Sequence, residues 1–240
     1  KTYEIELKDM ILHDETPYID QADNITFAGS ENYNIIYQEE SDDTYQEDDV
    51  YFVNDENGHL PLDTDTVKSY LSSIGSLRLS NYVSYNVTEE ELAVYGLDDP
   101  ELTVTVQYMV PKEDAEDDAS TDEKTEEVKT FVLHISRSAE EKAKVKEEES
   151  PEETDTSDDY ESEKESVSAY VRVGESQIIY EITETEYESL MDASYDKLRH
   201  QKIFWADFDK VTQVDISLEG QTYTLISKEE DEETVWFYGE

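Results

Sequence analysis

Alternating apolar and polar residues mark four consecutive segments between residues 102 and 182. These segments are Leu102–Tyr108, Val128–Ile135, Val167–Val173 and Ile178–Ile182. A period of two places the apolar side chains on one face of a strand. Gly174-Glu175-Ser176 leaves only a tight connection between the last two segments. The pattern therefore predicts an antiparallel meander of four strands with one apolar face.

Two further segments repeat apolar residues at the spacing of an amphipathic helix. Asp63 is the expected N-cap of the first helix, whose inner face should cover the sheet. That face consists of Val67, Tyr70, Leu71, Ile74 and Leu77. The second helix begins at Thr183, with Glu186 in capping-box register, and is expected to end near the basic cluster Lys197–Lys202.

A third, short helix is expected just before the first strand of the meander. Thr88 and Glu91 have the spacing of a capping box, and the helix should run to Tyr95. Gly96 stands where a left-handed residue would close this helix, and Pro100 prevents the helix from resuming.

A three-segment pattern near the N-terminus recurs near the C-terminus. The first copy reads Ile25-x-Phe27-x-Gly29, Tyr33-x-Ile35 and Val50-Tyr51-Phe52. The second reads Val214-x-Ile216-x-Leu218-x-Gly220, Tyr223-x-Leu225 and Val235-Trp236-Phe237. Each copy predicts a hairpin plus a third aromatic strand. Only the first copy leads into a helix, which suggests that the natural protein continues beyond this chain or that the terminal strands close a single sheet.

Two low-complexity acidic segments, Lys112–Glu127 and Ser138–Ser166, interrupt the meander. They are too charged and too poor in apolar residues to offset the entropy lost when they become ordered. We expect both to be long loops between paired strands. Ser138-x-x-Glu141 can start a solvated helix inside the second.

Composition removes several function classes. The formal net charge is −46 over 240 residues, which disfavours binding to nucleic acid or to an anionic membrane surface. The absence of Cys excludes a disulfide framework and a thiol nucleophile. No apolar run approaches the roughly 20 residues that cross a bilayer. Either the protein is cytosolic, or a signal or an anchor has been removed ahead of Lys1.

No motif in the chain predicts a catalytic residue, a cofactor site or a metal site. The four His residues lack the spacing of zinc or catalytic motifs. Asn54–Gly58 and Asp63-Thr-Asp65 resemble fragments of calcium loops, but turn and N-cap roles explain both. Tyrosines could line a sugar-binding or peptide-binding face, although packing within the sheet is the favoured interpretation. Those in the first copy are Tyr33, Tyr37, Tyr45 and Tyr51.

The hexapeptide Tyr95-Gly96-Leu97-Asp98-Asp99-Pro100 is the most specific feature of the chain in its context. It follows Leu71–Leu77 and precedes Tyr170–Val173 and Leu198-Arg199. This order of parts resembles the bacterial DUF4340 family, from about Ile25 to Trp236. The resemblance implies that Tyr95, Gly96, Leu97, Asp98 and Pro100 form a structural motif of that family.

The same resemblance carries an expectation about location. Members of the family look like extracytoplasmic proteins held by an N-terminal membrane helix or a lipid, and no activity is established for them. They are often encoded beside auxiliary parts of ABC-type or gliding-type transport systems. The resemblance therefore implies a cell-envelope location, through an anchor that this chain lacks, and a protein partner among membrane transport components.

Together these patterns predict an α+β fold, an antiparallel β-meander covered by short helices with repeat-related hairpins near both ends. Residues 1–203 are the expected main unit, and residues 204–240 are the start of a second repeat or a closing hairpin. The expected function is a non-enzymatic extracytoplasmic accessory or interaction domain without a cofactor. The alternative is a module that binds a small ligand or a divalent cation such as calcium.

The expected interaction edge is the C-terminal hairpin Val214–Ile226 together with Trp236. Its repeat counterpart is followed by a covering helix, whereas this hairpin is not, so its apolar strand surface is available to the rest of the natural chain or to another protein. Tyr223 and Trp236 are the candidate contact residues.

Overall fold

The computed structural model describes residues 13–55, 58–111, 126–148, 167–202, 210–218, 220–230 and 233–239. Contacts within the chain divide it into two compact units, Lys1–Arg199 and His200–Glu240. We refer to them as the N-terminal unit and the C-terminal unit and describe each by itself. The boundary expected between residues 203 and 204 falls within 203–209, outside the described residues.

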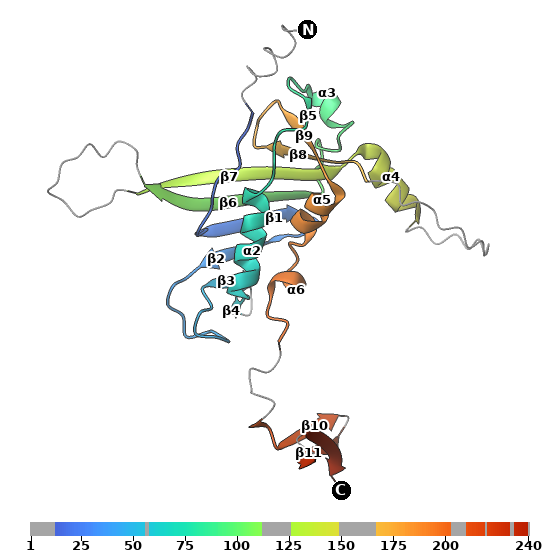
Figure 1. Ribbon diagram of the computed structural model, residues 1–240. Helices are drawn as coiled ribbons and strands as arrows, with labels where there is room; N and C mark the ends of the chain where they lie inside the picture. The colour runs from blue at the N-terminus through green and yellow to red at the C-terminus, as the bar shows by residue number, and fades with distance from the viewer. Residues whose placement is uncertain are drawn as a thin grey trace, which may run out of the picture. The chain divides into compact units, whose positions relative to one another are not determined.

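Nine antiparallel strands form the sheet of the N-terminal unit (Figure 1). They are β1 (Asn24–Gly29), β2 (Tyr33–Tyr37), β3 (Tyr51–Asp55), β4 (Gly58–Pro61), β5 (Tyr82–Ser84), β6 (Leu102–Pro111), β7 (Glu126–Arg137), β8 (Ala169–Val173) and β9 (Ile179–Ile182). Their order across the sheet is β4-β3-β2-β1-β6-β7-β8-β9-β5. Strands β6 to β9 pair in chain order, which confirms the predicted meander. With the helices described below, this sheet confirms the α+β class.

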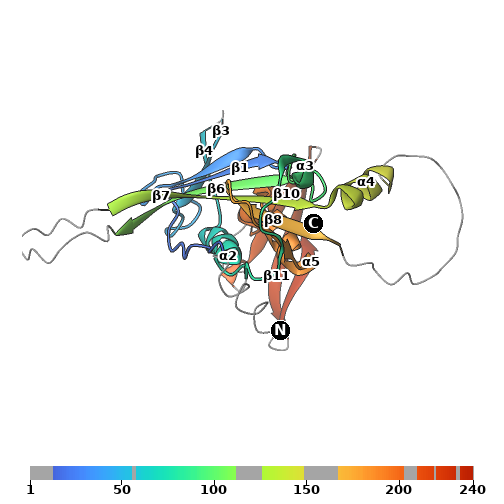
Figure 2. The same ribbon diagram turned by 90° about the horizontal axis from the view of Figure 1, so that it is seen from above.

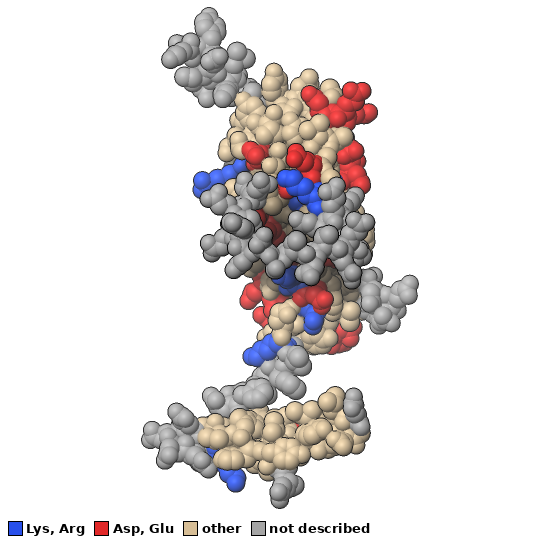
Figure 3. All heavy atoms as spheres, turned by 90° about the vertical axis from the view of Figure 1, so that its right-hand side faces the viewer, with Lys and Arg blue, Asp and Glu red and all other residues tan. Residues whose placement is uncertain are grey.

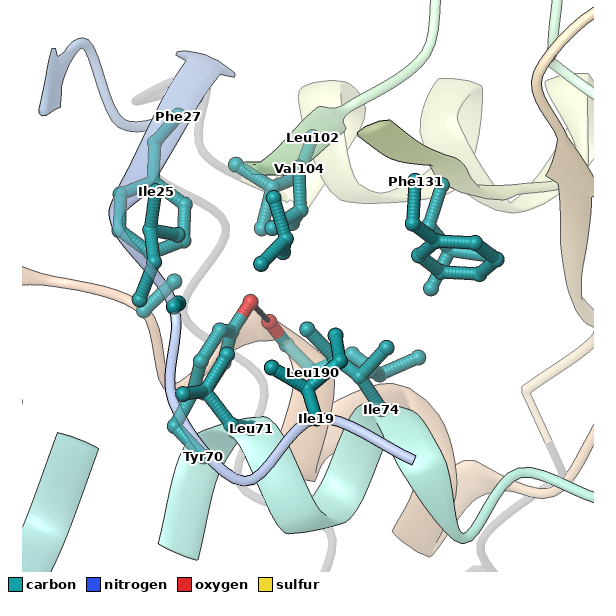
Figure 4. Packing of buried hydrophobic residues seen from close by; sticks show 14 of the residues in the cluster. Ile19, Ile25, Phe27, Tyr70, Leu71, Ile74, Leu102, Val104, Phe131 and Leu190 are labelled. Carbon is teal, nitrogen blue, oxygen red and sulfur yellow. Dashed lines mark hydrogen bonds between the residues drawn. The ribbon is translucent and has the colours of Figure 1, made fainter. Parts of the chain in front are cut away.

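One face of this sheet carries the hydrophobic core. In β6, Leu102, Val104 and Val106 are fully buried, whereas the alternate residues face away from the core. The helices α2 (Thr64–Gly75) and α5 (Glu184–Met191) lie on the core side of the sheet (Figure 2). The hydroxyl of Tyr70 in α2 donates a hydrogen bond of 3.0 Å to the carbonyl oxygen of Leu190 in α5, and this bond joins the two helices (Figure 4).

Both covering helices begin where the sequence predicts. The Asp63 side chain accepts a hydrogen bond from the N–H of Thr66 at 2.9 Å, and Thr183 and Glu186 form the predicted capping box. The prediction that the second helix runs to the basic cluster is wrong. Helix α5 ends at Met191 because Asp192 leaves the helical conformation (ψ 40°), and a separate helix α6 (Tyr195–Leu198) follows.

Three tyrosines of the first copy pack within the unit. Tyr51 is buried, and its hydroxyl accepts a hydrogen bond of 3.3 Å from the N–H of Ala22. The Tyr37 ring meets the Tyr51 ring edge-on at 5.6 Å between centroids. Tyr33 donates its hydroxyl proton to a backbone carbonyl of the segment after α5. Tyr45 differs, since its side chain is exposed.

The first acidic segment is more ordered at its end than the sequence suggests, whereas the second contains the helix expected to start at Ser138. Glu126 and Glu127, expected in the first loop, pair with Pro111 and Val110 and belong to β7. Pairing of this kind uses backbone groups only, so acidic side chains on an exposed strand end do not prevent it. In the second segment, Ala139–Glu148 form helix α4, whose first turn is capped by Ser138. Residues 112–125 and 149–166 lie outside the described residues.

The C-terminal unit contains three antiparallel strands, β10 (Gln213–Leu218), β11 (Gln221–Glu230) and β12 (Glu233–Gly239). They pair in chain order as a sheet of their own. Among the described residues none of them pairs with the nine-stranded sheet, so they do not close it. The predicted hairpin plus a third aromatic strand is therefore confirmed in the second copy.

Candidate functional site

The hexapeptide Tyr95–Pro100 begins as the closure of a short helix. Helix α3 (Glu89–Leu92) is shorter than the predicted helix, which was to run to Tyr95. The predicted capping box is present, with the Thr88 N–H 2.9 Å from a Glu91 carboxylate oxygen. The N–H of Leu97 then donates to the carbonyl of Leu92 at 2.9 Å, which is the six-residue bond of a Schellman closure. Such a closure requires a left-handed residue at Gly96, whose φ is +69°.

A second feature of the structure also requires glycine at position 96, because there is no room for a side chain. A β-carbon at this position would overlap the carbonyl oxygen of Arg137 and come within 2.8 Å of the Lys142 side chain and 2.9 Å of the Ser136 hydroxyl. The backbone of the hexapeptide thus packs directly on the end of β7 and on α4. Glycine is the residue type that satisfies both the conformation and the packing.

The other motif side chains make packing contacts. Tyr95 meets Tyr170 edge-on at 4.9 Å between ring centroids. Leu97 is buried in a small apolar cluster with Val87 and Ile179. Asp98 is exposed and Pro100 is partly buried. The structure therefore gives three of these five residues, Tyr95, Gly96 and Leu97, a part in closing the helix and fixing the segment to the sheet.

Lys142 of α4 holds the same segment from outside. Its ammonium group donates hydrogen bonds to the carbonyl oxygens of Gly96 at 2.8 Å and Asp99 at 2.6 Å. This residue was not predicted to contact the motif, because it lies in a segment interpreted as a solvated loop. The available signal was that Lys142 follows Ser138 by four residues, which places it in the first turns of the helix that Ser138 caps.

A half-buried ion pair lies beside the motif. The carboxylate of Glu101 accepts from the guanidinium of Arg137 at 2.6 and 3.0 Å, from the Arg137 backbone N–H at 2.7 Å and from the Tyr187 hydroxyl at 3.0 Å. Burial alone raises the pKa of Glu101, but these hydrogen bonds outweigh it and leave the pKa below its usual value. A cavity of about 450 Å³ opens here, lined by Gly29, Asp99, Pro100, Glu101, Arg137, Lys142 and Val145.

Both cations at this cavity direct donors to oxygen atoms of the protein itself. Arg137 pairs with Glu101, and Lys142 binds the two motif carbonyls. Their contacts tie β7, α4 and α5 to the motif. We therefore assign this cluster a structural role in the N-terminal unit.

A second polar cluster joins the segment before β1 to β9. A carboxylate oxygen of Asp14 accepts from the Ser176 hydroxyl at 2.6 Å and from the Tyr180 hydroxyl at 3.1 Å. The Tyr180 hydroxyl in turn accepts from the N–H of Asp14 at 2.7 Å. Burial raises the pKa of Tyr180 to about 12, so its hydroxyl stays protonated. The cluster anchors one chain segment to another.

The predicted calcium fragments have structural roles in the part of the chain that is described. Asp63 caps α2, and Asp55 pairs with Gly58 across the hairpin of β3 and β4. Within the described ranges, no group of three or more His, Cys, Asp or Glu side chains is arranged to hold a metal ion. The described helices also include none with the length and apolar character of a membrane span.

The C-terminal unit presents a different kind of surface, an apolar sheet face. Strand pairing places seven apolar or aromatic side chains on one side of the three strands. We call this set the apolar face; it consists of Val214, Ile216, Leu218, Tyr223, Leu225, Trp236 and Tyr238. No described side chain in β10, β11 or β12 is buried. Exposure reaches 46% for Ile216, 61% for Leu218 and 64% for Tyr238.

The opposite side of this sheet is more polar. The Thr224 hydroxyl donates to Asp215 at 2.6 Å, and the hydroxyls of Ser217 and Thr222 are 3.3 Å apart. Three apolar residues also lie on this side: Ile226 and Phe237, each 37% exposed, and Val235, which is half-buried. In Figure 3 uncharged side chains dominate the described part of the C-terminal unit, whereas acidic side chains spread over the N-terminal unit.

The two residues predicted as the interaction edge, Tyr223 and Trp236, both lie on the apolar face. Tyr223 is 37% exposed, and its ring lies 6.5 Å from that of Tyr238. Trp236 is half-buried rather than enclosed in a core. Tyr238 was not predicted as a contact residue, although its alternation with Trp236 along the same strand indicates that it shares the apolar face.

Comparisons with known proteins give one match. Residues 53–237 match the family described as "Domain of unknown function (DUF4340)". No curated protein and no solved structure matches the chain. The matched range covers most of the sequence, from β3 in the first copy to β12 in the second. The chain therefore belongs to the DUF4340 family.

Proposed function

We propose that this chain is a non-enzymatic, extracytoplasmic interaction domain that binds a protein partner through the apolar face of β10, β11 and β12. The observation that carries the proposal is the exposure of that face, with Ile216, Leu218 and Tyr238 each about half exposed or more. Contiguous exposed apolar side chains mark interaction sites, whereas scattered ones do not.

Stability gives a second reason for a partner. A three-stranded sheet is stable when one of its hydrophobic faces is packed against another layer. In the described residues of β10, β11 and β12 no side chain is buried, so this sheet has no core of its own. A partner that covers the apolar face would supply the missing burial, at roughly 25 cal/mol for each Å² of apolar surface removed from water.

The charge of the chain and its apolar face would contribute to binding in different ways. A net charge of −46 attracts a basic partner over distance and raises the rate of encounter. Affinity comes mainly from a few desolvated aromatic and apolar residues near the centre of an interface. Trp236, Tyr223 and Tyr238 are aromatic residues of that kind on the apolar face.

The extracytoplasmic location and a link to a transport system are parts of the proposal that rest on the family resemblance. The partner would then be another protein of the cell envelope.

Photo-crosslinking in the source cells tests the proposed function. A photoreactive amino acid replaces Ile216 on the apolar face in one variant of the full chain and Ile226 on the opposite side in another. We expect position 216 to give one dominant crosslinked protein of the cell envelope and position 226 to give none. Equal crosslinking at the two positions, or none at either, would contradict the proposal.

A further inference from the structure

The two copies of the internal repeat agree residue by residue in their strand pairing. In the first copy Ile25 pairs with Ile35 and Phe27 with Tyr33. In the second copy the corresponding pairs are Val214 with Leu225 and Ile216 with Tyr223. The sequence alignment of the repeat assigned these same residues to one another. The apolar face is therefore the counterpart of the side of β1 and β2 that carries these four residues.

The third strand obeys the same register. Phe52 pairs with Ile36 in the first copy, and Phe237 pairs with Ile226 in the second. One position further, Tyr51 pairs with Tyr37, and Trp236 pairs with Ser227. The connections between the strands differ in length, so the two copies agree in the pairing of their strands and not in their loops. This shared pairing makes Trp236 the counterpart of buried Tyr51.

In the first copy an amphipathic helix covers this face. Helix α2 places Val67, Tyr70, Leu71 and Ile74 in the same buried cluster as Ile25, Phe27 and Ile35. The ring of Tyr70 meets that of Phe27 edge-on at 5.6 Å between centroids. The four helix residues follow the spacing i, i+3, i+4 and i+7, which presents one apolar stripe to the strands. Under this cover Ile25 and Ile35 are fully buried.

We propose that the occupant of the apolar face is an amphipathic helix of a partner protein, with an apolar stripe at the spacing of α2 and basic residues beside the stripe. This inference rests on the proposed function and names the kind of partner. The partner's stripe would lie over Ile216, Tyr223 and Leu225, as α2 lies over Phe27, Tyr33 and Ile35. Basic residues are expected because the chain carries a net charge of −46.

The described helices of this chain do not provide such a helix. Helices α2 and α5 already direct their apolar residues into the core of the N-terminal unit. Helix α4 has Val145 as its one large apolar residue and therefore no stripe. Helices α3 and α6 have four residues each, too few for a stripe of two turns. A second copy of the chain is disfavoured because two molecules of this charge repel each other.

The probe for this inference is a peptide with the sequence of residues 61–77, which contains α2, in which Asp65 and Ser69 beside the stripe are exchanged for Lys to supply the basic residues. The labelled peptide is titrated with the full chain, in which α2 of the N-terminal unit is already in place, and fluorescence anisotropy reports binding. We expect saturable binding that gains helical circular dichroism. Exchange of Tyr70 and Leu71 for Ser in the peptide should abolish binding, because it interrupts the apolar stripe.

Matched variants of the chain locate the binding. Ile216→Ser on the apolar face should weaken binding at least tenfold, whereas Ile226→Ser on the opposite side should leave it within about twofold. Leu218→Ser is the second variant on the apolar face. Binding is compared only for variants whose circular dichroism spectrum matches that of the unaltered chain. Equal losses for Ile216→Ser and Ile226→Ser, or no binding of the probe peptide, would overturn the inference.

Two further outcomes separate this inference from the proposed function. A dimer in sedimentation that Ile216→Ser abolishes would assign the face to a second copy and overturn the helix. Crosslinking from position 216 without peptide binding would refute a helical occupant and leave the interaction domain intact. Absence of both signals would refute the two together.

Discussion

The two copies of the repeat share one pattern of strand pairing and differ in burial. Phe27 and Ile216 occupy corresponding positions, yet Phe27 is buried and Ile216 is 46% exposed. Ile25 is likewise fully buried, whereas its counterpart Val214 is only half-buried. The side-chain pattern of a strand thus specifies its partners and its apolar side. Whether that side becomes a core depends on the layer that covers it.

The cover in the N-terminal unit is held by specific polar contacts. Asp63 caps the covering helix α2, and Tyr70 connects α2 to α5. In the C-terminal unit the described side-chain hydrogen bonds lie within one strand, between neighbouring strands or at a nearby loop residue. The same sheet pattern therefore serves as a scaffold in one copy and as a candidate docking surface in the other.

The largest expected contrast comes from shortening two matched residues, Phe27 under α2 and Ile216 on the apolar face. Phe27→Ala should lower the free energy of unfolding of the N-terminal unit by about 3–5 kcal/mol, because it leaves a cavity in a packed site. Ile216→Ala should cost less than about 1 kcal/mol, since water already reaches the side chain. Urea unfolding of the two variants measures both values. Similar losses would show that the second copy is packed like the first.

Substitution of two matched glycines compares packing in the two units, with a smaller expected loss of stability. Gly96 and Gly220 both have positive φ, at +69° and +79°. A β-carbon at Gly96 meets Arg137, Lys142 and Ser136, whereas one at Gly220 meets nothing within 4 Å. Gly220→Ala should therefore cost only the backbone strain, about 1–2 kcal/mol. Gly96→Ala should cost about 2–4 kcal/mol, because overpacking adds to the strain.

Thermal unfolding of these two glycine variants checks the expected order. Gly174→Ala is a further control, since Gly174 also has positive φ and open space around it. If Gly96→Ala behaved like the two controls, the motif would not be packed against β7 and α4 as described.

A smaller contrast concerns the dependence of stability on pH. The pKa of Glu101 is lowered in the fold, so its ionised form stabilises the fold above the unfolded pKa near 4.5, and that contribution is lost as the pH falls through the lower folded pKa. Glu101→Gln should therefore destabilise the protein at about pH 7, and the difference from the unaltered chain should shrink at about pH 3. Urea unfolding at the two pH values measures this difference.

Asp215 is the matched group in the C-terminal unit. Hydrogen bonds from Thr224 and Gln213 lower its pKa, but the side chain is exposed to solvent, which screens the interaction. Asp215→Asn should therefore change stability less than Glu101→Gln at about pH 7. A larger effect of Asp215→Asn would mean that the polar side of β10 and β11 is more enclosed than described.

Local sequence signals predicted a large part of the fold. Alternation gave the four meander strands, and side-chain caps at Asp63, Thr88 and Thr183 gave the starts of three helices. The repeat alignment gave the strand pairing of both copies. These features depend on contacts within a few residues or on a period of two, so a single sequence contains them.

Features that depend on distant contacts were not predicted. Strand β5 has three residues and is recognisable only by its pairing with β9. Lys142 bonds to carbonyls 43 and 46 residues away, which no spacing rule indicates. The break between α5 and α6 arises where Ser194 caps a new helix, a signal that the basic cluster nearby obscured. The Glu101–Arg137 pair joins the start of β6 to the end of β7, so predicting it would have required knowledge of the register between the two strands.

Native-state hydrogen exchange tests most directly whether the second copy of the repeat has the strand pairing of the first copy but no layer covering its apolar face. The pairing between β1 and β2 and that between β10 and β11 supply matched backbone hydrogen bonds in the full chain. We expect amides in both pairs to be protected, with β10 and β11 exchanging at least a hundredfold faster, because a sheet without a buried face opens more readily. Equal protection of the two pairs would contradict the account, since it would mean that the C-terminal sheet is already covered.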